Sequence, residues 1–204
     1  MASTPTAGKP ANAYHHGDLR NALLQLAWTH IERGGEAQLS LRKLAEELGV
    51  SHAAPAHHFG DKAGLLEHLQ FLAWQEFADL LETASPDGLK AMGLRYVAHG
   101  IAHPRRMALM FNNPLVPWTE ATKQQCMRAW QALSDAVARY VGPVRASDEQ
   151  QLAALVIACW AQVHGLAKLW TETTLPPAVP TGAAALPLHS AALDVLLAGL
   201  QAGS

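Results

Sequence analysis

Histidine is the residue type whose chemistry stands out in this sequence. The chain has 204 residues, of which 11 are His, and its formal net charge is -2 with His taken as neutral. Three of these histidines fall between residues 51 and 60, in a segment without Asp or Glu. Because a free imidazole titrates near about pH 6.5, we expect this segment to be nearly neutral at high pH and positively charged at lower pH.

The other reactive side chains lack the spacing of a catalytic motif. His99 and His103 are four residues apart, which would let two imidazoles share a metal ion, but no Cys or carboxylate lies nearby in sequence. A structural role is therefore the favoured interpretation of this pair. The sequence has no GxSxG elbow, no phosphate-binding glycine loop and no HExxH motif. We therefore expect no enzyme, no metal site and no cofactor.

The two cysteines bear on the redox compartment. Cys126 and Cys159 are too few and too far apart for a disulfide framework or a four-ligand zinc site, which favours a reducing interior. The pair could sense oxidants if the two thiols meet across helices, but both lie on apolar stripes and core packing is favoured. Met1 to Ala13 lacks the apolar run of a signal peptide, so we expect a flexible N-terminal arm and a cytoplasmic protein.

Composition excludes several classes of protein. Half of the residues are hydrophobic and 16% are charged, whereas a disordered chain needs low hydrophobicity and high charge. No global excess of Lys and Arg exists, which argues against nucleic-acid binding by bulk charge. The most membrane-like stretch has an apolar core at 152–161, only about half the roughly 20 residues that a spanning helix needs. A buried helix of a soluble bundle explains this stretch better.

Apolar residues at spacings of three and four predict helices along nearly the whole chain, and no segment has the period of a strand. The expected helices cover 18–33, 41–48, 51–58, 61 to about 80, 89–103, 104–112, 118–141, 147–171 and 188–201. Ser40, Ser51 and Asp61 are the expected N-caps. Breaks are expected at 85–88, at Gly142-Pro143 and over 175–187. The sequence therefore predicts an all-α fold of about nine helices.

The most informative unit is the segment LSLRKLAEELGVSHAAPAHHFGDK. Two short helices joined by a turn with glycine have the spacing of a helix-turn-helix. In that motif the first helix braces the second, which presents its exposed face to the major groove of DNA. The periodicity alone leaves an ordinary helical corner as an equal alternative.

The runs YHHGDLRNALL and LSLRKLAEELGVSHAAPAHHFGDKAGLL resemble the DNA-binding domain of the TetR (tetracycline-repressor-like) transcriptional regulators, without a gap. The later segments RYVAHGIAHPRRMALMF and WAQVHGLAKLW resemble the ligand-binding half of a subgroup with a Trp-His-Gly motif, here Trp160, His164 and Gly165. The resemblance implies an N-terminal three-helix domain and a C-terminal helical bundle. The implied boundaries are 1–13 for the arm, 14–83 for the DNA-binding domain with its linking fourth helix (helix-turn-helix 40–59) and 84–204 for ligand binding and dimerisation.

The resemblance also implies which residues meet double-stranded DNA. Phe59 would be a core wedge behind the recognition helix, and His58 is as readily a packed or capping residue as a DNA contact. His15 and His16 would either touch phosphate or belong to a disordered arm. The implied contacts are Ser40, Arg42, Lys43, Ser51, His52, Ala53, Ala56, His57, His58 and Lys62.

This sequence departs from the family pattern on the DNA-facing helix. The family usually has Tyr at the position of Ala56, where the hydroxyl donates to a phosphate, and close relatives often have Arg at the position of His57. Pro55 is typical of the subgroup but removes one backbone N–H early in the helix, so an irregular helix start is expected. Between residues 14 and 83 five basic and ten acidic residues give a formal charge of -5. We expect weak salt dependence and binding that tightens between about pH 8 and pH 6.5.

The C-terminal half carries many large, soft side chains, which is typical of an apolar ligand pocket between helices. The implied effector is an apolar or aromatic small molecule, with His164 as a polar contact, although most of these residues could equally be plain core. Gly165 is expected to permit a close helix approach. The candidate ligand-binding residues are Met107, Met110, Phe111, Trp118, Met127, Trp130, Trp160 and His164.

The last helices are implied to form a homodimer. Leu193, Leu196, Leu197 and Leu200 lie on one terminal helix and are expected to need a partner surface. A two-fold dimer would set two recognition helices about 34 Å apart on a palindromic operator. The resemblance therefore implies a ligand-responsive repressor. The alternative is a related ligand-binding protein whose DNA binding is weakened or lost.

Overall fold

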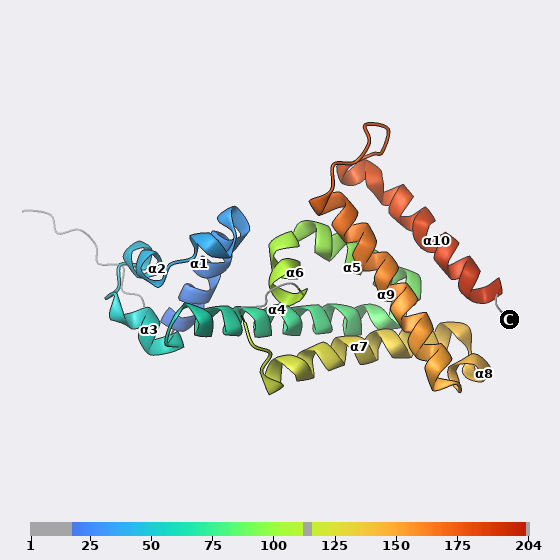
Figure 1. The fold of residues 1–204 in the computed structure, drawn as a ribbon, viewed down its shortest axis with the longest axis horizontal. Helices are drawn as coiled ribbons and strands as arrows, with labels where there is room; N and C mark the ends of the chain where they lie inside the picture. Colours follow the sequence, from blue (N-terminus) through green and yellow to red (C-terminus); the bar gives the residue numbers. More distant parts are fainter. Residues whose placement is uncertain (1–17, 112–115, 203–204) are drawn as a thin grey trace, which may run out of the picture. The chain divides into compact units, whose positions relative to one another are not determined.

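The computed structural model describes residues 18–111 and 116–202, so His15 and His16 lie outside the described residues. The described chain contains ten α-helices, three short 3-10 helices and no strand (Figure 1). The predicted all-α class is confirmed. Contacts divide the chain into two compact units that meet within one helix, the first ending at Leu65 and the second beginning at Leu66.

The helices follow the sequence in a simple order. Their bounds are α1 Leu19–Gly34, α2 Leu41–Leu48, α3 Ala53–Phe59, α4 Lys62–Ala84, α5 Leu89–Ala102, α6 Pro104–Phe111, α7 Glu120–Val141, α8 Pro143–Ala146, α9 Glu149–Glu172 and α10 Leu186–Ala202. The 3-10 helices are η1 Glu36–Gln38, η2 Ser85–Asp87 and η3 Gly182–Ala185.

The first unit is built on α1, α2 and α3, which all contact one another. Its core includes Leu23, Ile31 and Leu44, each at most 1% exposed. Gly49 ends α2 in the left-handed conformation at φ 67°, which costs glycine no Cβ clash. Its N–H and that of Val50 bond back to carbonyls of the last turn of α2. The chain therefore turns sharply into α3, as a helix-turn-helix requires.

The helix α4 begins with a side-chain cap. The Asp61 carboxylate accepts a hydrogen bond of 2.9 Å from the backbone N–H of Gly64, which satisfies one of the unpaired donors of the first turn. A Cβ at Gly64 would lie 2.1 Å from the Phe59 carbonyl oxygen. The α3–α4 corner therefore needs a glycine at this position.

The second unit is a bundle in which α5 packs most extensively on α9 and also on α10. Two glycines of α5 make the close approach possible. A Cβ at Gly100 would lie 2.7 Å from the Cβ of Ala167, and one at Gly93 would lie 3.0 Å from Leu193. A Cβ at Gly165 would meet no atom within 4 Å, so the expectation of a close approach at Gly165 was wrong and α5 supplies it instead.

Three helix starts differ from the expectation, and two of them involve proline. Gly142-Pro143 begins the short helix α8, and Pro187 lies in the first turn of α10, which starts at Leu186. Proline suits a helical first turn because its missing N–H would have no partner there. The N-cap of α3 is His52 and not Ser51, while the Ser51 carbonyl accepts from the Ala54 N–H.

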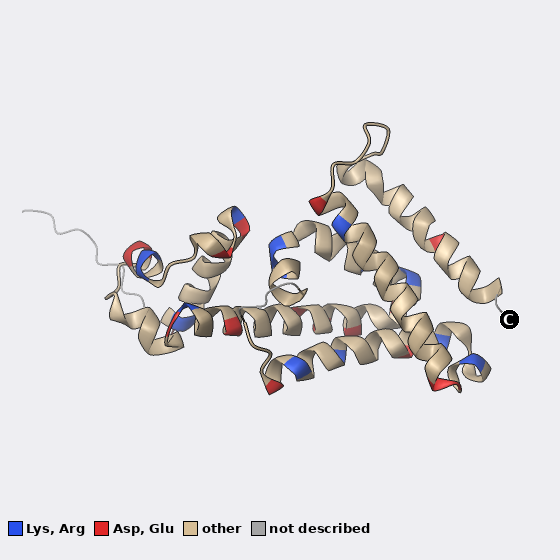
Figure 2. Cartoon of the chain, viewed as in Figure 1, with Lys and Arg blue, Asp and Glu red and all other residues tan. Residues whose placement is uncertain are grey.

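Two segments, α9 and 182–202, are long and apolar enough to cross a membrane by length and composition alone. Figure 2 shows how few charges they carry: α10 has a single acidic residue, Asp194. Bundle helices pass the same test, so this is weak evidence for a span. Both helices contact α5, which accounts for part of their apolar surface.

Candidate nucleic-acid interface and ligand pocket

The expected DNA-facing residues lie largely on exposed positions of α2 and α3. Ser40 is the N-cap of α2 in extended conformation, and its side chain makes no capping hydrogen bond. Lys62, at the start of α4, is half-buried. The exposed members of the set are Arg42, Lys43, Ser51, His52, Ala53, Ala56, His57 and His58.

Behind this surface, Phe59 holds α3 in place. Its side chain is 6% exposed, and the Arg20 guanidinium of α1 lies 5.4 Å from its ring centroid. Pro55 is also buried, at the third residue of α3, where a backbone N–H would have no intrahelical partner. Pro55 therefore costs α3 no intrahelical hydrogen bond, while the start of the helix has its N-cap His52 in the helical conformation and no side-chain cap. The motif did not reveal the Arg20 contact, since the two residues are 39 positions apart in sequence.

One carboxylate neutralises part of the positive charge. Glu46 accepts a hydrogen bond of 2.9 Å from Arg42 Nε, and its Oε1 lies 3.5 Å from His52 Nε2. The hydrogen bond from Arg42 lowers the pKa of Glu46, so the carboxylate stays charged. Two of the expected DNA contacts therefore share an anionic neighbour in the absence of DNA.

In the second unit, an aromatic chamber lies between α4, α5, α6, α7 and α9. The space inside it that a water-sized molecule can occupy is about 50 Å³, and no charged residue is among the described residues that line it. Phe111, Trp130 and Trp160, three of the expected ligand-binding residues, meet here. The aromatic lining residues are Trp74, Phe77, Tyr96, Phe111, Trp130 and Trp160.

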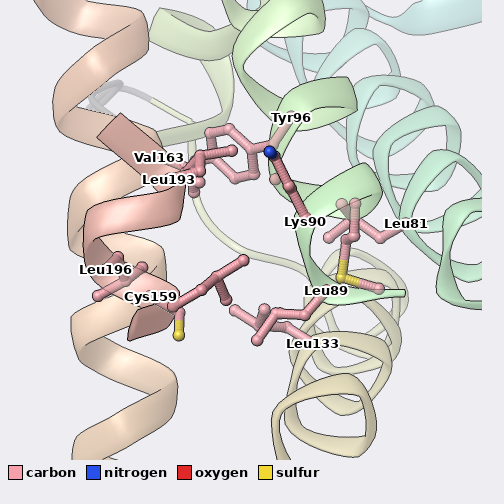
Figure 3. A pocket seen from close by; sticks show the side chains of 12 residues that line it. Leu81, Leu89, Lys90, Tyr96, Leu133, Cys159, Val163, Leu193 and Leu196 are labelled. Atoms are coloured by element: carbon pink, nitrogen blue, oxygen red, sulfur yellow. The ribbon is translucent and has the colours of Figure 1, made fainter. Parts of the chain in front are cut away.

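Next to it lies an aliphatic chamber, in which a water-sized molecule can occupy about 30 Å³, and this chamber reaches α10 (Figure 3). It shares Leu81, Tyr96 and Leu133 with the aromatic chamber, so the two are contiguous. Its lining also includes Leu89, Lys90, Met92, Cys159, Leu193 and Leu197. Small-molecule sites usually measure about 300–1,000 Å³, so the helices around the two chambers must move apart to admit a ligand.

At the junction, three polar side chains satisfy one another. Trp160 Nε1 donates to the Tyr96 hydroxyl at 3.1 Å, and that hydroxyl lies 2.8 Å from His164 Nδ1. The hydroxyl accepts from Trp160 and can still either donate to His164 Nδ1 or accept from it, depending on the tautomer of the imidazole. Burial lowers the pKa of His164 and raises that of Tyr96, which keeps both groups uncharged.

The remaining expected ligand-binding residues lie elsewhere. Met107 and Met110 are buried, at 7% and 1% exposure, and Met107 and His164 line a smaller cavity. Trp118 is 40% exposed and packs edge to face against Trp74, while Met127 is 58% exposed. Among the described residues that line the two chambers, neither Trp118 nor Met127 is present.

Sequence reasoning missed the part of the lining that comes from α4 and α5. Trp74, Phe77 and Leu81 are spaced three and four residues apart on α4, so their common face was visible as an apolar stripe. Tyr96 gave no such signal, because its role depends on contacts with α9.

The two cysteines are free and line different chambers, Cys126 the aromatic one and Cys159 the aliphatic one. Burial raises the pKa of both thiols, that of Cys159 to about 11. Thiols in this state are poor nucleophiles. The rings of His99 and His103 have centroids 5.0 Å apart and are tilted by 55° to each other, and no cluster of three or more potential metal ligands occurs within 18–111 and 116–202.

Charged residues of α4 tie it to its neighbours in the second unit. Arg128 of α7 donates to both Asp79 and Glu82 of α4, at 2.7 and 2.5 Å, and Arg106 of α6 pairs with Glu76. These carboxylates lie on the same helix as Trp74 and Phe77 of the aromatic chamber. A molecule entering that chamber would therefore act on a helix that is held from both α6 and α7.

Comparison with known proteins adds the family. Residues 23–69 match the family described as bacterial regulatory proteins, tetR family, and residues 89–193 match the family described as tetracyclin repressor-like, C-terminal domain. No curated protein matches the chain in sequence.

Solved structures agree with these matches. A protein of unknown function from Rhodococcus sp. RHA1 is 30% identical, with a TM-score of 0.77, over 93% of this chain and 98% of that one. The TetR family transcriptional regulator PfmR from Thermus thermophilus is 22% identical, with a TM-score of 0.62, over 88% of this chain and 98% of that one. The latter likeness shows the fold alone. The helix-turn-helix, the bundle and the two family matches together establish that this chain belongs to the TetR family of bacterial transcriptional regulators.

Proposed function

We propose that this DNA-binding transcriptional regulator is a ligand-responsive repressor that acts as a homodimer on a palindromic operator in the cytoplasm. The observation that supports the proposal is that α4 carries an expected DNA contact and also lines the two chambers. This helix begins at Lys62, an expected phosphate contact, and lines both chambers further along, through Trp74, Phe77 and Leu81. A ligand that displaces α4 thereby changes the geometry of DNA binding.

The proposed DNA contacts are the exposed groups of α2 and α3 together with Ser40 and Lys62. Ser40, Arg42, Lys43 and Lys62 meet phosphates, while Ser51, His52, Ala53, Ala56, His57 and His58 face the groove. Base-edge contacts would then come mainly from histidines. Binding is expected to tighten between about pH 8 and pH 6.5, and an affinity that stays flat over that range at fixed salt contradicts this role.

We further infer that Trp160, His164 and Gly165 form the Trp-His-Gly motif that names a subgroup of the family. Trp160 and His164 both bond to the Tyr96 hydroxyl, which supports a shared purpose for the first two positions. The motif then acts by fixing Tyr96 at the junction of the chambers, and His164 contacts the ligand only through that residue.

The homodimer is proposed to form through α9 and α10. Leu193, Leu197 and Leu200 are buried against the chain's own helices, at 3%, 8% and 5% exposure, so the expectation that they need a partner surface was wrong. The exposed large apolar side chains of α9 are Ile157 and Leu169, at 54% and 43%, and those of α10 are Leu186, Leu188 and Val195, at 55%, 41% and 75%. A two-fold partner would cover this face.

The test is a gel shift with DNA that flanks the gene for this protein. A specific shift that weakens on adding a ligand of the chambers supports the proposal, whereas equal operator affinity with and without bound ligand rejects the ligand response. The histidine-rich surface makes low salt and pH 6.5 the most favourable conditions.

A second candidate function is a TetR-like ligand-binding protein with weakened or lost DNA binding. It is favoured by the exposed Ala56, which cannot supply a phosphate-binding hydroxyl, and by Glu46, which neutralises Arg42. Absence of any shift at low salt and pH 6.5 would support this candidate. If Ala56→Tyr then restores a shift, the missing contact is the cause.

A further inference from the structure

Lys90 is the sole charged side chain among the described residues that line the two chambers. It comes from α5 and lies among apolar neighbours of the aliphatic chamber (Figure 3). Its side chain is 39% exposed, which places the ammonium group at the rim and not in the interior. A ligand that fills the chamber would therefore bring its outer end against a cation.

The present partner of Lys90 is Asp194 of α10. Lys90 Nζ lies 2.6 Å from Asp194 Oδ1, and the aspartate side chain is 58% exposed. Ion pairs between exposed groups contribute little net stability, because water solvates both partners well when they separate. Exchange of this partner for another anion therefore costs little.

The rest of the lining is largely apolar, with the buried Trp74 indole N–H as a donor that has no hydrogen-bond partner. The Tyr96 hydroxyl is occupied by Trp160 and His164, and the other aromatic lining residues are Trp74, Phe77, Phe111 and Trp130. Burying a polar group without a hydrogen-bond partner is unfavourable. The body of the ligand must therefore be largely apolar, with an aromatic end suited to the aromatic chamber.

We propose that the two chambers form one site for an amphipathic monoanion, and that its anionic end replaces Asp194 as the ion-pair partner of Lys90. The aromatic end occupies the aromatic chamber, an aliphatic segment passes Tyr96, and a carboxylate or similar group reaches Lys90. This assignment rests on the proposed ligand response and gives it a ligand class. It also gives α10 a part in the response, since binding removes the ion pair that joins α10 to α5.

The test compares two probes that share the same phenylalkyl body and differ in the head group, the anionic ω-phenyloctanoate and the neutral ω-phenyloctanol. Each is titrated into the full-length protein without DNA, and binding is followed by tryptophan fluorescence, because Trp74, Trp130 and Trp160 line the aromatic chamber. The carboxylate is expected to bind about tenfold more tightly than the alcohol. Equal affinities, or no binding of either probe, would overturn the proposal.

Variants of Lys90 and Asp194 test whether the preference for the carboxylate comes from this ion pair. Lys90→Gln should remove the advantage of the carboxylate and leave the affinity for the alcohol unchanged, while Asp194→Asn should strengthen carboxylate binding by removing a competitor. The matched control is Lys123→Gln, which breaks an exposed Lys123–Glu120 pair on α7 away from the chambers. A Lys90→Gln variant that keeps the ratio of affinities, or that weakens both probes alike, would contradict the assignment.

A variant that fills part of the aromatic chamber tests whether the body of the ligand lies there. Ala129 lines the aromatic chamber and is 4% exposed, so Ala129→Leu should weaken both probes while leaving their ratio intact. Unchanged affinity for both would show that the ligand body lies outside the chamber. All of these measurements are made without DNA, so their failure leaves DNA binding standing, and a failed gel shift leaves the ligand assignment standing.

Discussion

At the scale of single residues, Glu46 decides how much positive charge α2 and α3 present. Its carboxylate pairs with Arg42 and lies beside His52, so two groups expected to meet DNA are partly neutralised by their own chain. The carboxylate would also lie near the phosphates that Arg42 is expected to meet. We therefore expect Glu46 to be one of the acidic residues of 14–83 that oppose DNA binding.

We expect Glu46→Gln to tighten DNA binding by about threefold at low salt, because one negative charge near the phosphates is removed. The gain should shrink as salt rises, since the interaction is solvent-exposed and screened. A titration of labelled DNA by fluorescence anisotropy measures it. Glu120→Gln on α7 provides the control, and weaker binding by Glu46→Gln would show that the carboxylate instead orients Arg42 for its contact.

Tyr96 is the residue on which the polar chemistry of the second unit depends. Tyr96→Phe leaves the Trp160 N–H and His164 Nδ1 without their shared partner in a part-buried place. We expect the free energy of unfolding to fall by about 1–3 kcal/mol, the cost of leaving such groups unpaired. Urea unfolding followed by circular dichroism measures this. An unchanged midpoint would mean that water replaces the hydroxyl.

At the scale of elements, α5, α9 and α10 each carry a histidine that burial keeps neutral. Burial lowers the pKa of His99 on α5 to about 4, and it also lowers the pKa of His164 on α9 and His189 on α10. The unfolded chain binds more protons than the folded chain between pH 6.5 and pH 4. Stability is therefore fully present above about pH 6.5 and is lost as the pH falls through that window.

For His99 we expect a loss of about 1–3 kcal/mol on going from pH 6.5 to pH 4, after allowing for its partial exposure. His99→Gln should flatten the dependence of the unfolding free energy on pH over that window. Urea titrations at several pH values measure the slope. His57→Gln changes an exposed histidine of α3 and serves as the control, and an equal slope in both variants would refute the role of His99.

The elements also show what the sequence could predict. Helix type and approximate bounds followed from apolar spacing, as α2 at Leu41–Leu48 illustrates. The starts of α8 and α10 did not, because Pro143 and Pro187 were interpreted as breaks although proline also suits a first turn. The fate of Leu193 and Leu197 depended on which helix lies beside α10, and the periodicity of one helix cannot give that information.

Only some of the residues that line the two chambers could be predicted from the sequence. Phe111, Trp130 and Trp160 were chosen for size and softness, and they do meet in the aromatic chamber. Met127 has the same character yet is 58% exposed, because it lies on another face of α7. The roles of Lys90 and Tyr96 could not be predicted from the sequence, because they depend on contacts with residues of α9 and α10.

At the scale of the whole molecule, α9 and α10 expose apolar side chains that the packing within one chain does not cover. Ile157, Leu188 and Val195 are exposed there, and α10 carries Asp194 as its single acidic residue and no Lys or Arg (Figure 2). Exposed apolar surface of this kind marks an interface. We expect a second copy of the chain to cover it, because a two-fold dimer would also fit the proposed palindromic operator.

We expect Val195→Asp to dissociate the dimer, because a carboxylate would be buried without a partner at the centre of an apolar interface. Sedimentation equilibrium measures the mass, and operator affinity should fall with dissociation because each monomer then holds one recognition helix. Val144→Asp on α8 is the matched control, since Val144 is 85% exposed and lies outside α9 and α10. If Val195→Asp remains a dimer while Val144→Asp dissociates, the interface lies at α8, and the two-fold arrangement of the recognition helices must be rebuilt around that helix.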